Sequence, residues 1–318
     1  MHPCLRFSFS RMLYFTIGLL ENTPLRSEQR PGAAPRRKRI MSEMRSAIQK
    51  FSTVPFKGAD DFSRPWGEVD LLALPTAPTD RYVTGFALST RCVDEALRLR
   101  YEVFNLELEE GLESSAATDL DRDAFDDHMT HLVLLERDTH RVVGTYRMHS
   151  ASRAAAGLYS AQEYDLSALD PYLETSVELG RACVAADHRT FRTMVALWLG
   201  IGAFMNAYAL RHLFGCCSLT SRDPMDGWRA LRTIRETDSL HSQLYLPARE
   251  AYSCGSEPDS EESDVEAPYM LPKLFHTYLR LGSKVISEPA IDREFGTVDF
   301  LVLQDGKRLT FSPLDVLK

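Results

Sequence analysis

The residues best suited to chemistry lie in one apolar segment, residues 176–184, which reads Ser-Val-Glu-Leu-Gly-Arg-Ala-Cys-Val. The segment predicts a strand, and two opposite charges, Glu178 and Arg181, interrupt it. These two side chains point to opposite faces of a regular strand, unless a bulge re-aims one of them. A charge among apolar neighbours is unfavourable unless it is paired, so this segment is a candidate site.

Further charges interrupt or flank apolar elements elsewhere in the chain. The complete pattern comprises Arg100, Asp123, Asp126, Arg147, Glu178 and Arg181. Two interpretations follow, because a buried charge must be stabilised either by another charged residue of the protein or by a bound polar ligand. The residues form either a structural ion-pair network or an electrostatic cleft that holds a polar substrate. Their spacing alone favours neither.

A third candidate is the loop at residues 187–192, Asp-His-Arg-Thr-Phe-Arg, which precedes a predicted helix. The free N–H groups and the dipole of a helix start favour an anion, and guanidinium groups can bind an anion through two parallel hydrogen bonds. A phosphopantetheine phosphate is one such anion. The alternative interpretation is that Arg189 and Arg192 are ordinary solvated loop residues.

Other patterns with known chemistry do not indicate a site. His128 and His131 form an HxxH pair that leads into a strand, which favours structural hydrogen bonds over metal binding. Cys183 is expected to pack in the core, as lone cysteines usually do. The sequence has no GxSxG motif, and its six cysteines form no CxxC pair. An α/β-hydrolase, a zinc ribbon and a disulfide scaffold are therefore not indicated.

Hydrophobic periodicity predicts the elements that must position these residues. Ser89-Thr90 stands where a helix N-cap is expected, and Asp223-Pro224 opens a helix with proline at its first position. Strands are expected at residues 83–88, 131–136, 141–148, 176–185, 213–219 and 297–303, and helices at 93–104, at 193–210, from 224 and at 271–281. This alternation indicates an α/β domain built around a mixed sheet.

Composition and charge narrow the class of protein. The chain has 318 residues, of which 44% are hydrophobic and 26% charged, and its formal net charge is -8. The negative charge argues against a general nucleic-acid binder, because phosphate neutralisation needs a basic surface. The apolar run at residues 12–20 is shorter than the ~20 residues that span a bilayer. Together with the cysteine pattern, this predicts a cytoplasmic protein.

Two parts are expected along the chain. Residues 1–80 are rich in Pro, Arg and Ser and predict a leader or disordered segment. The basic run at 35–39 is interpreted as a solvated tail, with weak peripheral contact at the inner face of the membrane as the alternative. Residues 81–318 are expected to form one domain, interrupted at about 254–268 by an acidic, Ser-rich flexible insertion.

Four motifs in order carry a resemblance to a known family. They are Arg100-Tyr101-Glu102-Val103-Phe104, Asp123-Ala124-Phe125-Asp126, Gly144-Thr145-Tyr146-Arg147 and Glu178-Leu179-Gly180-Arg181. This pattern resembles that of acyl-homoserine-lactone synthases and of the acyl-carrier-protein-dependent N-acyltransferases of ornithine-lipid and N-acyl amino acid synthesis. These families belong to the GNAT superfamily. The closer relatives also share residues 159–166, 213–218 and 289–300, so the resemblance runs from about Tyr82 to the C-terminus, outside the acidic insertion.

The resemblance implies a fold and an activity. The fold is the GNAT acyltransferase fold, an α/β (α+β) fold with a central mixed, mostly antiparallel sheet flanked by helices. The activity is transfer of a (3-hydroxy)fatty-acyl group from an acyl-carrier-protein thioester to the amine of an amino acid, with ornithine as the expected acceptor. The alternatives are synthesis of an N-acyl amino acid or homoserine-lactone signal, and a non-catalytic lipid-binding or interaction module.

Two departures from related patterns refine this expectation. The Trp that homoserine-lactone synthases carry shortly after the Phe is absent, since residues 106–112 hold only Leu, Glu and one Gly. This absence disfavours a quorum signal. The glycine-rich coenzyme A loop of ordinary acetyltransferases is also missing, and residues 187–192 stand in its place. A carrier-protein donor is therefore expected, with acyl-coenzyme A as the alternative.

The resemblance also implies roles for individual residues. The thioester is expected in a V-shaped opening between two central strands, with Glu178 as the base that takes the amine proton through water and Arg181 beside it. The structural alternative for Glu178 is a salt bridge to Arg181 or Arg147. Backbone amides near residues 182–184 would stabilise the oxyanion if the strand bulges there.

The remaining roles fall into two groups. Substrate binding is expected of Arg100, Phe104, Asp123, Asp126 and Arg147. Binding of the acyl-phosphopantetheine donor is expected of Cys183, Val184, Arg189, Arg192 and Thr193. No metal and no permanently bound cofactor is implied, and the expected partners are the acyl carrier protein and the amino-acid acceptor.

Overall fold

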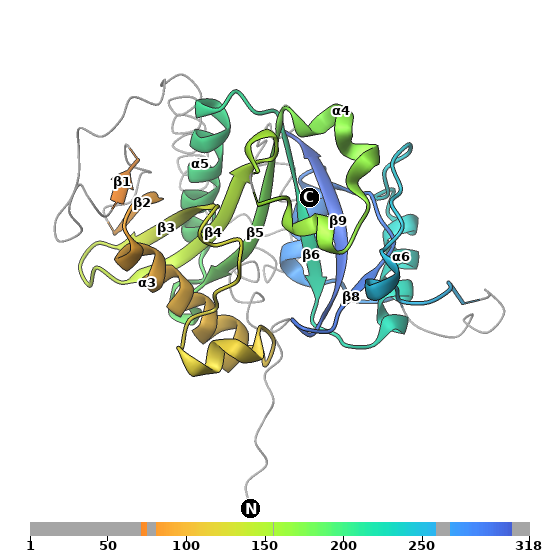
Figure 1. Ribbon diagram of the computed structural model, residues 1–318, viewed down its shortest axis with the longest axis horizontal. Helices are drawn as coiled ribbons and strands as arrows, with labels where there is room; N and C mark the ends of the chain where they lie inside the picture. Colours follow the sequence, from red (N-terminus) through yellow and green to blue (C-terminus); the bar gives the residue numbers. More distant parts are fainter. Residues whose placement is uncertain (1–70, 75–80, 155, 259–267, 307–318) are drawn as a thin grey trace, which may run out of the picture.

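The computed structural model describes residues 71–74, 81–154, 156–258 and 268–306. This part of the chain folds around a nine-stranded sheet with the order β1-β2-β3-β4-β5-β6-β9-β7, and β8 pairs with β9 outside this path (Figure 1). Neighbouring strands are antiparallel except β5 and β6, which are parallel. The expected mixed, mostly antiparallel sheet flanked by helices is confirmed.

The strands and helices follow the alternation predicted from the sequence. The strands are β1 (Leu71–Ala73), β2 (Tyr82–Ala87), β3 (Thr130–Glu136), β4 (Val142–Ser150), β5 (Ser176–Val184), β6 (His212–Leu219), β7 (Lys284–Val285), β8 (Ala290–Asp292) and β9 (Thr297–Asp305). The α-helices are α3 (Thr90–Tyr101), α4 (Asp170–Leu173), α5 (Phe191–Ala207), α6 (Pro224–Glu236) and α7 (Lys273–Arg280). A π-helical segment, η1 (Glu102–Glu107), continues α3, and short 3₁₀ segments are η2 (Glu113–Ala117), η3 (Ala151–Arg153), η4 (Tyr159–Gln162), η5 (Leu166–Leu169), η6 (Ala186–His188) and η7 (Glu250–Tyr252).

Local hydrogen bonds explain where the longer helices begin. Ser89 caps α3 by accepting a hydrogen bond from the backbone N–H of Cys92, and Asp223 caps α6 with proline at the first position. Thr190 caps α5 in the same way. The predicted starts of α3 and α6 are therefore confirmed, and α5 begins two residues earlier than expected.

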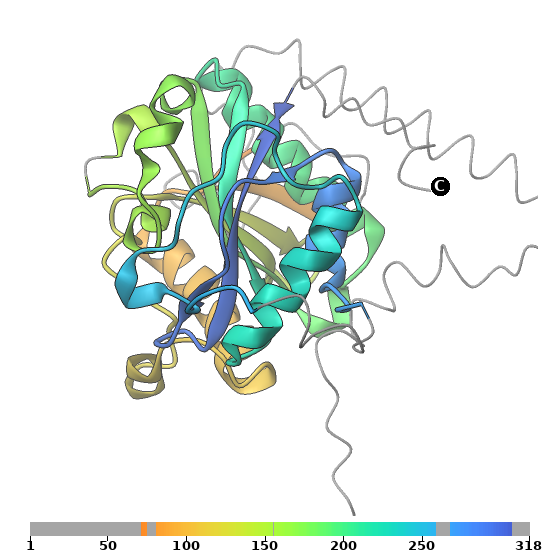
Figure 2. The same ribbon diagram turned by 90° about the vertical axis from the view of Figure 1, so that its right-hand side faces the viewer.

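Helices cover both faces of the sheet. Helix α3 lies on one face of strands β2–β5 and α5 lies on the other (Figure 1). Helices α6 and α7 lie on the same side as α5 (Figure 2). The alternation of β9 explains this arrangement, because Phe300 packs against Phe275 of α7, whereas Leu301 belongs to the cluster around Tyr164 on the opposite face.

The central strands β5 and β6 pair only over a short distance. Their parallel register joins Ser176–Glu178 to His212–Phe214 and ends there. Directly beyond this point a Cβ at Gly215 would lie 2.1 Å from the carbonyl oxygen of Leu179, so the close approach requires glycine. The two strands then separate, which creates the V-shaped opening that the resemblance implied.

Strand β5 also carries a bulge on its other edge. Arg147 of β4 is paired with Gly180 and Thr145 with Cys183, so Arg181 and Ala182 together face a single residue of β4. Arg181 has a φ of 47°, in the left-handed region that a non-glycine residue rarely adopts. Such bulges re-aim side chains next to functional sites. The bulge that the sequence left as a condition is therefore present, at Arg181–Ala182.

Two boundaries differ from the expectation. Strand β1 pairs with β2 over Leu71–Ala73, so the folded part begins before the expected domain start at residue 81. Cys254, placed at the start of the insertion, is buried and its carbonyl accepts a hydrogen bond from the indole of Trp228. The expected leader up to residue 70 and the insertion residues 259–267 lie outside the described residues.

Candidate active site

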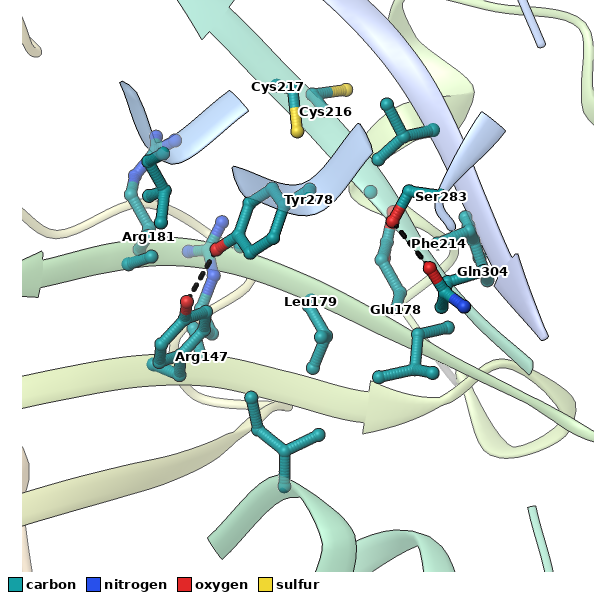
Figure 3. A pocket seen from close by; sticks show the side chains of 18 of the residues that line it. Arg147, Glu178, Leu179, Arg181, Phe214, Cys216, Cys217, Tyr278, Ser283 and Gln304 are labelled. Carbon is teal, nitrogen blue, oxygen red and sulfur yellow. Dashed lines mark hydrogen bonds between the residues drawn. The ribbon is translucent and has the colours of Figure 1, made fainter. Parts of the chain in front are cut away.

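A cavity of about 560 Å³ opens where β5 and β6 separate. Both strands line it, as do residues from the two faces of the sheet, so the cavity passes between the strands from one face to the other. This volume lies within the ~300–1,000 Å³ typical of small-molecule sites. Figure 3 shows Arg147 and Arg181 at one side of the cavity and Ser283 with Gln304 at the other, with Leu179 between them.

The wall formed by α5 and α7 is largely apolar. It includes Val195, Trp198, Leu199, Met205, Leu274 and Tyr278. The hydroxyl of Tyr278, labelled in Figure 3, shares a hydrogen bond with that of Tyr146, so a half-buried and a buried tyrosine meet this wall with their polar atoms paired. A wall of this kind suits a hydrocarbon chain, because it offers apolar contact and few unpaired polar groups.

The wall on the opposite face of the sheet carries charge. It includes Glu110, Arg147, Tyr159, Glu178, Arg181 and Asp299. The guanidinium of Arg181 lies 4.3 Å from the ring centre of Phe295 and 5.0 Å from that of Tyr159, so the two rings sandwich it. The cavity thus joins an apolar region to a polar one at the point where β5 bulges.

Behind the charged wall lies a buried ion-pair network. Arg100 donates to Asp121 at 2.7 Å and to Asp126 at 2.6 Å, and all three side chains are fully buried. Arg147 donates to Asp123 and Asp126 at 2.5 and 3.0 Å. Burial acts to raise the pKa of Asp126, but the charges of Arg100 and Arg147 hold it well below its usual value. Asp126 therefore stays ionised at neutral pH.

Arg181 joins the same network from the bulge. Its guanidinium lies 3.4 Å from Asp121 and 3.2 Å from Asp123. Burial acts to lower the pKa of Arg181, and its acidic neighbours and Tyr159 raise it well above its usual value. The structural ion-pair network expected from the sequence is therefore present, and two of its members, Arg147 and Arg181, also line the cavity. That the cavity holds a polar substrate stays a prediction.

This geometry revises the expected substrate-binding residues. Phe104 and Arg147 line the cavity. Arg100, Asp123 and Asp126 do not, and Arg100 is 0% exposed, so a substrate in this cavity cannot touch its guanidinium. These three residues instead orient Arg147 and Arg181. Their expected role in substrate binding is replaced by a positioning role. A carboxylate can be buried here only because it is paired with an arginine, and that pairing fixes the arginine's position.

Glu178 lines the cavity, but its carboxylate is occupied. Oε1 accepts hydrogen bonds from the backbone N–H of Ser160 and from its hydroxyl, both at 2.7 Å. Oε2 accepts from the backbone N–H of Tyr159 at 3.0 Å and pairs with His149 at 3.2 Å. These contacts use the four lone-pair positions of a carboxylate. These hydrogen bonds anchor residues 159–160, and they involve neither Arg147 nor Arg181, the partners of the alternative salt bridge. The role of Glu178 as the base stays a prediction.

The expected donor-binding residues lie outside the cavity lining. The guanidinium of Arg189 binds both carboxylate oxygens of Glu107, at 2.7 and 2.8 Å, and the carbonyl of Val184. Glu107 belongs to η1, so Arg189 links the loop before α5 to the end of α3. Its expected role in binding phosphate stays a prediction. Thr193 is fully buried and donates to the carbonyl of His188, whereas Arg192 is exposed at the start of α5.

Cysteine and histidine residues match the non-catalytic interpretation. Burial raises the pKa of the Cys183 thiol far above its usual value, so the thiol stays protonated and is a poor nucleophile. His131 is buried and pairs with the backbone carbonyl of Asp126 at 3.0 Å, as expected for structural hydrogen bonding. Among the described residues, the group that could hold a metal is a different one, Glu163, Cys216 and Asp299.

Sequence reasoning missed three acidic residues near the cavity. Burial raises the pKa of Glu110 to about 7, a shift that Thr220 opposes and Asp299 increases. Burial also raises the pKa of Asp299 to about 6, and the pKa of Glu163 well above its usual value. Asp299 and Glu163 lie in the segments shared with closer relatives, residues 289–300 and 159–166. Their place in these segments was the sequence feature that could have indicated a role in the site.

The fold and the cavity together define a class of enzyme. A largely antiparallel sheet separates at one parallel strand pair, a bulge faces the opening, and an apolar wall adjoins a charged one. Residues 99–199 match the model of the acetyltransferase (GNAT) domain family. The protein is a GNAT-type acyltransferase.

Similar proteins place the chain more closely. An L-ornithine N(alpha)-acyltransferase from Brucella abortus (strain 2308) is 31% identical over 239 residues, which cover 70% of this chain and 84% of that protein. One from Rhodobacter capsulatus is 32% identical over 232 residues, covering 67% of this chain and 85% of that protein. Among solved structures, an N-acyl amino acid synthase from uncultured soil microbes is 12% identical, with a TM-score of 0.44 over 72% of this chain and 93% of that one. The chain belongs to the family of these bacterial ornithine N-acyltransferases.

In the described part of the chain, no helix has both the length and the apolar character that crossing a bilayer requires.

Proposed function

We propose that this chain transfers a fatty-acyl group from a phosphopantetheine thioester to the α-amine of L-ornithine. The observation that carries the proposal is the cavity between β5 and β6, which is apolar toward α5 and α7 and charged toward Arg147 and Arg181. Transfer of a long acyl chain to a polar amino acid needs both environments at one junction. The relatives named L-ornithine N(alpha)-acyltransferase support ornithine as the acceptor.

The bulge on β5 is the proposed place of reaction. The amine attacks the thioester carbonyl, the C–N bond forms, the C–S bond breaks and the thiol leaves with a proton. Backbone N–H groups beside Ala182, which lines the cavity, stabilise the oxyanion. The ammonium must first lose a proton, and this proton passes to water because the hydrogen bonds of Glu178 occupy its carboxylate.

The proposed donor is an acyl carrier protein rather than free coenzyme A. The glycine-rich coenzyme A loop is absent from the sequence, and Arg192 is exposed at the start of α5, where an acidic partner can approach. Arg192 is then an encounter contact with the carrier protein, and such contacts weaken as salt screens charge over a Debye length of ~8 Å.

Incubation of the purified chain with L-ornithine should give Nα-acyl-ornithine with long-chain acyl carrier protein and much less with the same acyl-coenzyme A. The product is measured by mass spectrometry, with 3-hydroxyacyl and unsubstituted chains compared. Arg192→Glu should reduce the rate with the carrier protein most strongly at low salt, and Arg98→Glu, at an exposed position of α3 on the opposite face of the sheet, serves as its control. Efficient turnover of acetyl-coenzyme A alone contradicts the carrier-protein donor, and acylation of other amines without ornithine contradicts the acceptor.

Gly202 offers a test of the acyl-chain wall. It lies in the C-terminal half of α5, lines the cavity, and a Cβ added there meets nothing within 4 Å. Gly202→Leu should therefore fill cavity space and lower the rate with the longest acyl donors about 10-fold or more, while short donors keep their rate, because overpacking is unfavourable by ~1–3 kcal/mol. Rates are compared across a donor series.

Gly202→Ala is the matched control for this substitution. It should raise thermal stability slightly, since alanine is favoured over glycine in a helix by ~1 kcal/mol, and leave the chain-length profile unchanged. An equal effect of Gly202→Leu on long and short donors would place the acyl chain elsewhere.

A further inference from the structure

A recess of acidic side chains adjoins the charged wall of the cavity. Glu163 comes from the segment after η4, Cys216 from β6 and Asp299 from β9, and one ligand atom of each lies within 4.8 Å of the others. Asp299 and Cys216 line the cavity, and Glu163 lies beside Cys216, whose thiol is 3.6 Å from its carboxylate. The recess therefore borders the space where an acceptor would bind.

Two carboxylate oxygens in the recess have no hydrogen-bond partner. They are Oδ1 of Asp299 and Oε1 of Glu163, and both are buried, since the residues are only 4% and 1% exposed. A buried polar atom without a partner is unfavourable and rare in native proteins, so each such atom needs an explanation. A ligand that donates hydrogen bonds to both oxygens would provide one.

The charges around the recess also favour a cationic ligand. Burial raises the pKa of Glu163 and Asp299, and the two carboxyl groups repel each other and Asp292. The charge of Arg181 acts to lower the pKa of both groups, but Arg181 is also paired with Asp121 and Asp123, and the pKa of both groups stays raised. A bound cation would let the carboxyl groups ionise, because it adds positive charge beside them.

The ligand atoms suit an ammonium better than a metal ion. Two acceptors about 2.8 Å from one tetrahedral nitrogen lie about 4.6 Å apart, which agrees with the limit of 4.8 Å in the recess. Hard cations such as Mg²⁺ prefer oxygen ligands alone, and Zn²⁺ prefers a thiolate. Burial keeps the thiol of Cys216 protonated by raising its pKa, so neither class of metal finds its usual ligand set.

We propose that Asp299 and Glu163 bind the side-chain ammonium of a basic amino acid acceptor, and so select such acceptors over neutral ones. The proposal rests on the function proposed above and adds the residues that read the acceptor's side chain. With its side-chain ammonium in the recess, the acceptor extends from β9 toward Arg147 and Arg181. The α-carboxylate then lies toward these arginines, whose Nε atoms have no hydrogen-bond partner although their other nitrogens are paired, and the α-amine lies toward the bulge.

The test compares L-ornithine with L-norvaline, which has the same carbon skeleton without the side-chain amine. Asp299→Asn keeps the shape of the side chain and removes its charge. It should lower kcat/KM for ornithine about 10- to 100-fold and change that for norvaline less than about threefold, because a hydrogen bond to a charged group is lost for ornithine alone. Glu163→Gln should act in the same direction. Glu250→Gln, on an exposed helix, is the control.

Each other outcome decides against the proposal. An equal loss for ornithine and norvaline would make Asp299 a structural residue, and no loss for either would remove it from acceptor binding. Activity that EDTA abolishes and a divalent metal restores would assign the recess to a metal.

A binding measurement separates this proposal from the proposed function. Ornithine should raise the melting temperature of the wild-type chain more than norvaline does, and Asp299→Asn should abolish the difference. Wild-type chain that shows this difference but forms no acyl-ornithine would contradict the proposed function alone. Wild-type chain that forms acyl-ornithine without the difference would contradict the recess alone.

Discussion

Replacing Arg100 by methionine should lower the free energy of unfolding by about 3–5 kcal/mol, because it leaves buried carboxylates without their partner. Arg100 is 0% exposed and donates to Asp121 and Asp126, whose side chains are equally buried. Arg147 still reaches Asp126, but Asp121 keeps only the longer contact of 3.4 Å to Arg181. Urea denaturation followed by circular dichroism measures the loss.

Arg122→Met is the matched control for this substitution. Arg122 pairs with Asp94 and Asp127 at the surface, where the side chains are 36% to 78% exposed, and such pairs contribute about 0–1 kcal/mol. A small decrease in the free energy of unfolding for Arg122→Met and a large decrease for Arg100→Met would identify the network as structural. A stable Arg100→Met protein whose only defect is a higher KM for the acceptor would restore the substrate-binding role expected from the sequence.

The charged residues of the site could be recognised from the sequence because their surroundings are apolar. Arg147 and Arg181 each stand in a segment whose neighbours predict a buried strand, and both line the cavity. Which charges touch a substrate could not be predicted in the same way. Asp121 was absent from the sequence pattern, although it is one of the two buried carboxylates that pair with Arg100. Which charged side chains pair with one another depends on how deeply each is buried in the folded chain. The hydrophobic periodicity of the sequence does not give that depth.

The loop before α5 illustrates the same limit. Two arginines before a helix start predict an anion site, and Arg192 is exposed as that interpretation requires. Arg189 instead meets Glu107, which lies 82 residues earlier in a π-helical segment. The sequence contains both residues, but nothing local indicates that α3 ends beside this loop. The contact arises from the packing of α3 against the sheet.

The acidic recess was beyond prediction for a related reason. Glu163, Cys216 and Asp299 come from three separate parts of the chain that meet only because β9 pairs with β6 and the segment after η4 covers them. From the sequence, each of these residues taken alone is explained equally well without a binding site, as a solvated acid or as a cysteine packed in the core. The motifs that contain them could be recognised by resemblance, whereas their joint chemistry required the structure.

Glu178→Gln should reduce turnover about 10²-fold and also destabilise the fold. The carboxylate accepts hydrogen bonds from two backbone N–H groups and from Ser160, and the amide of glutamine turns one acceptor oxygen into a donor that faces them. Residues 159–160 should then shift, and Tyr159 with them. Tyr159 stacks on Arg181 and donates to Asp292, and a displacement of about 1 Å at such a site can lower the rate 10²-fold.

The pH dependence of this variant separates anchoring from proton transfer. If Glu178 anchors the segment, raising the pH leaves the rate of Glu178→Gln low and its melting temperature reduced, because more free amine does not restore the geometry. If Glu178 takes the amine proton through water, the variant keeps its stability and the rate recovers partly as the pH rises, since the acceptor then arrives deprotonated. Glu174→Gln, an exposed position before β5, controls for the substitution itself. Initial rates between pH 7 and about 9.5, with the melting temperature at each pH, decide between the two roles, and we expect the anchoring profile because the contacts of Glu178 use both of its oxygens.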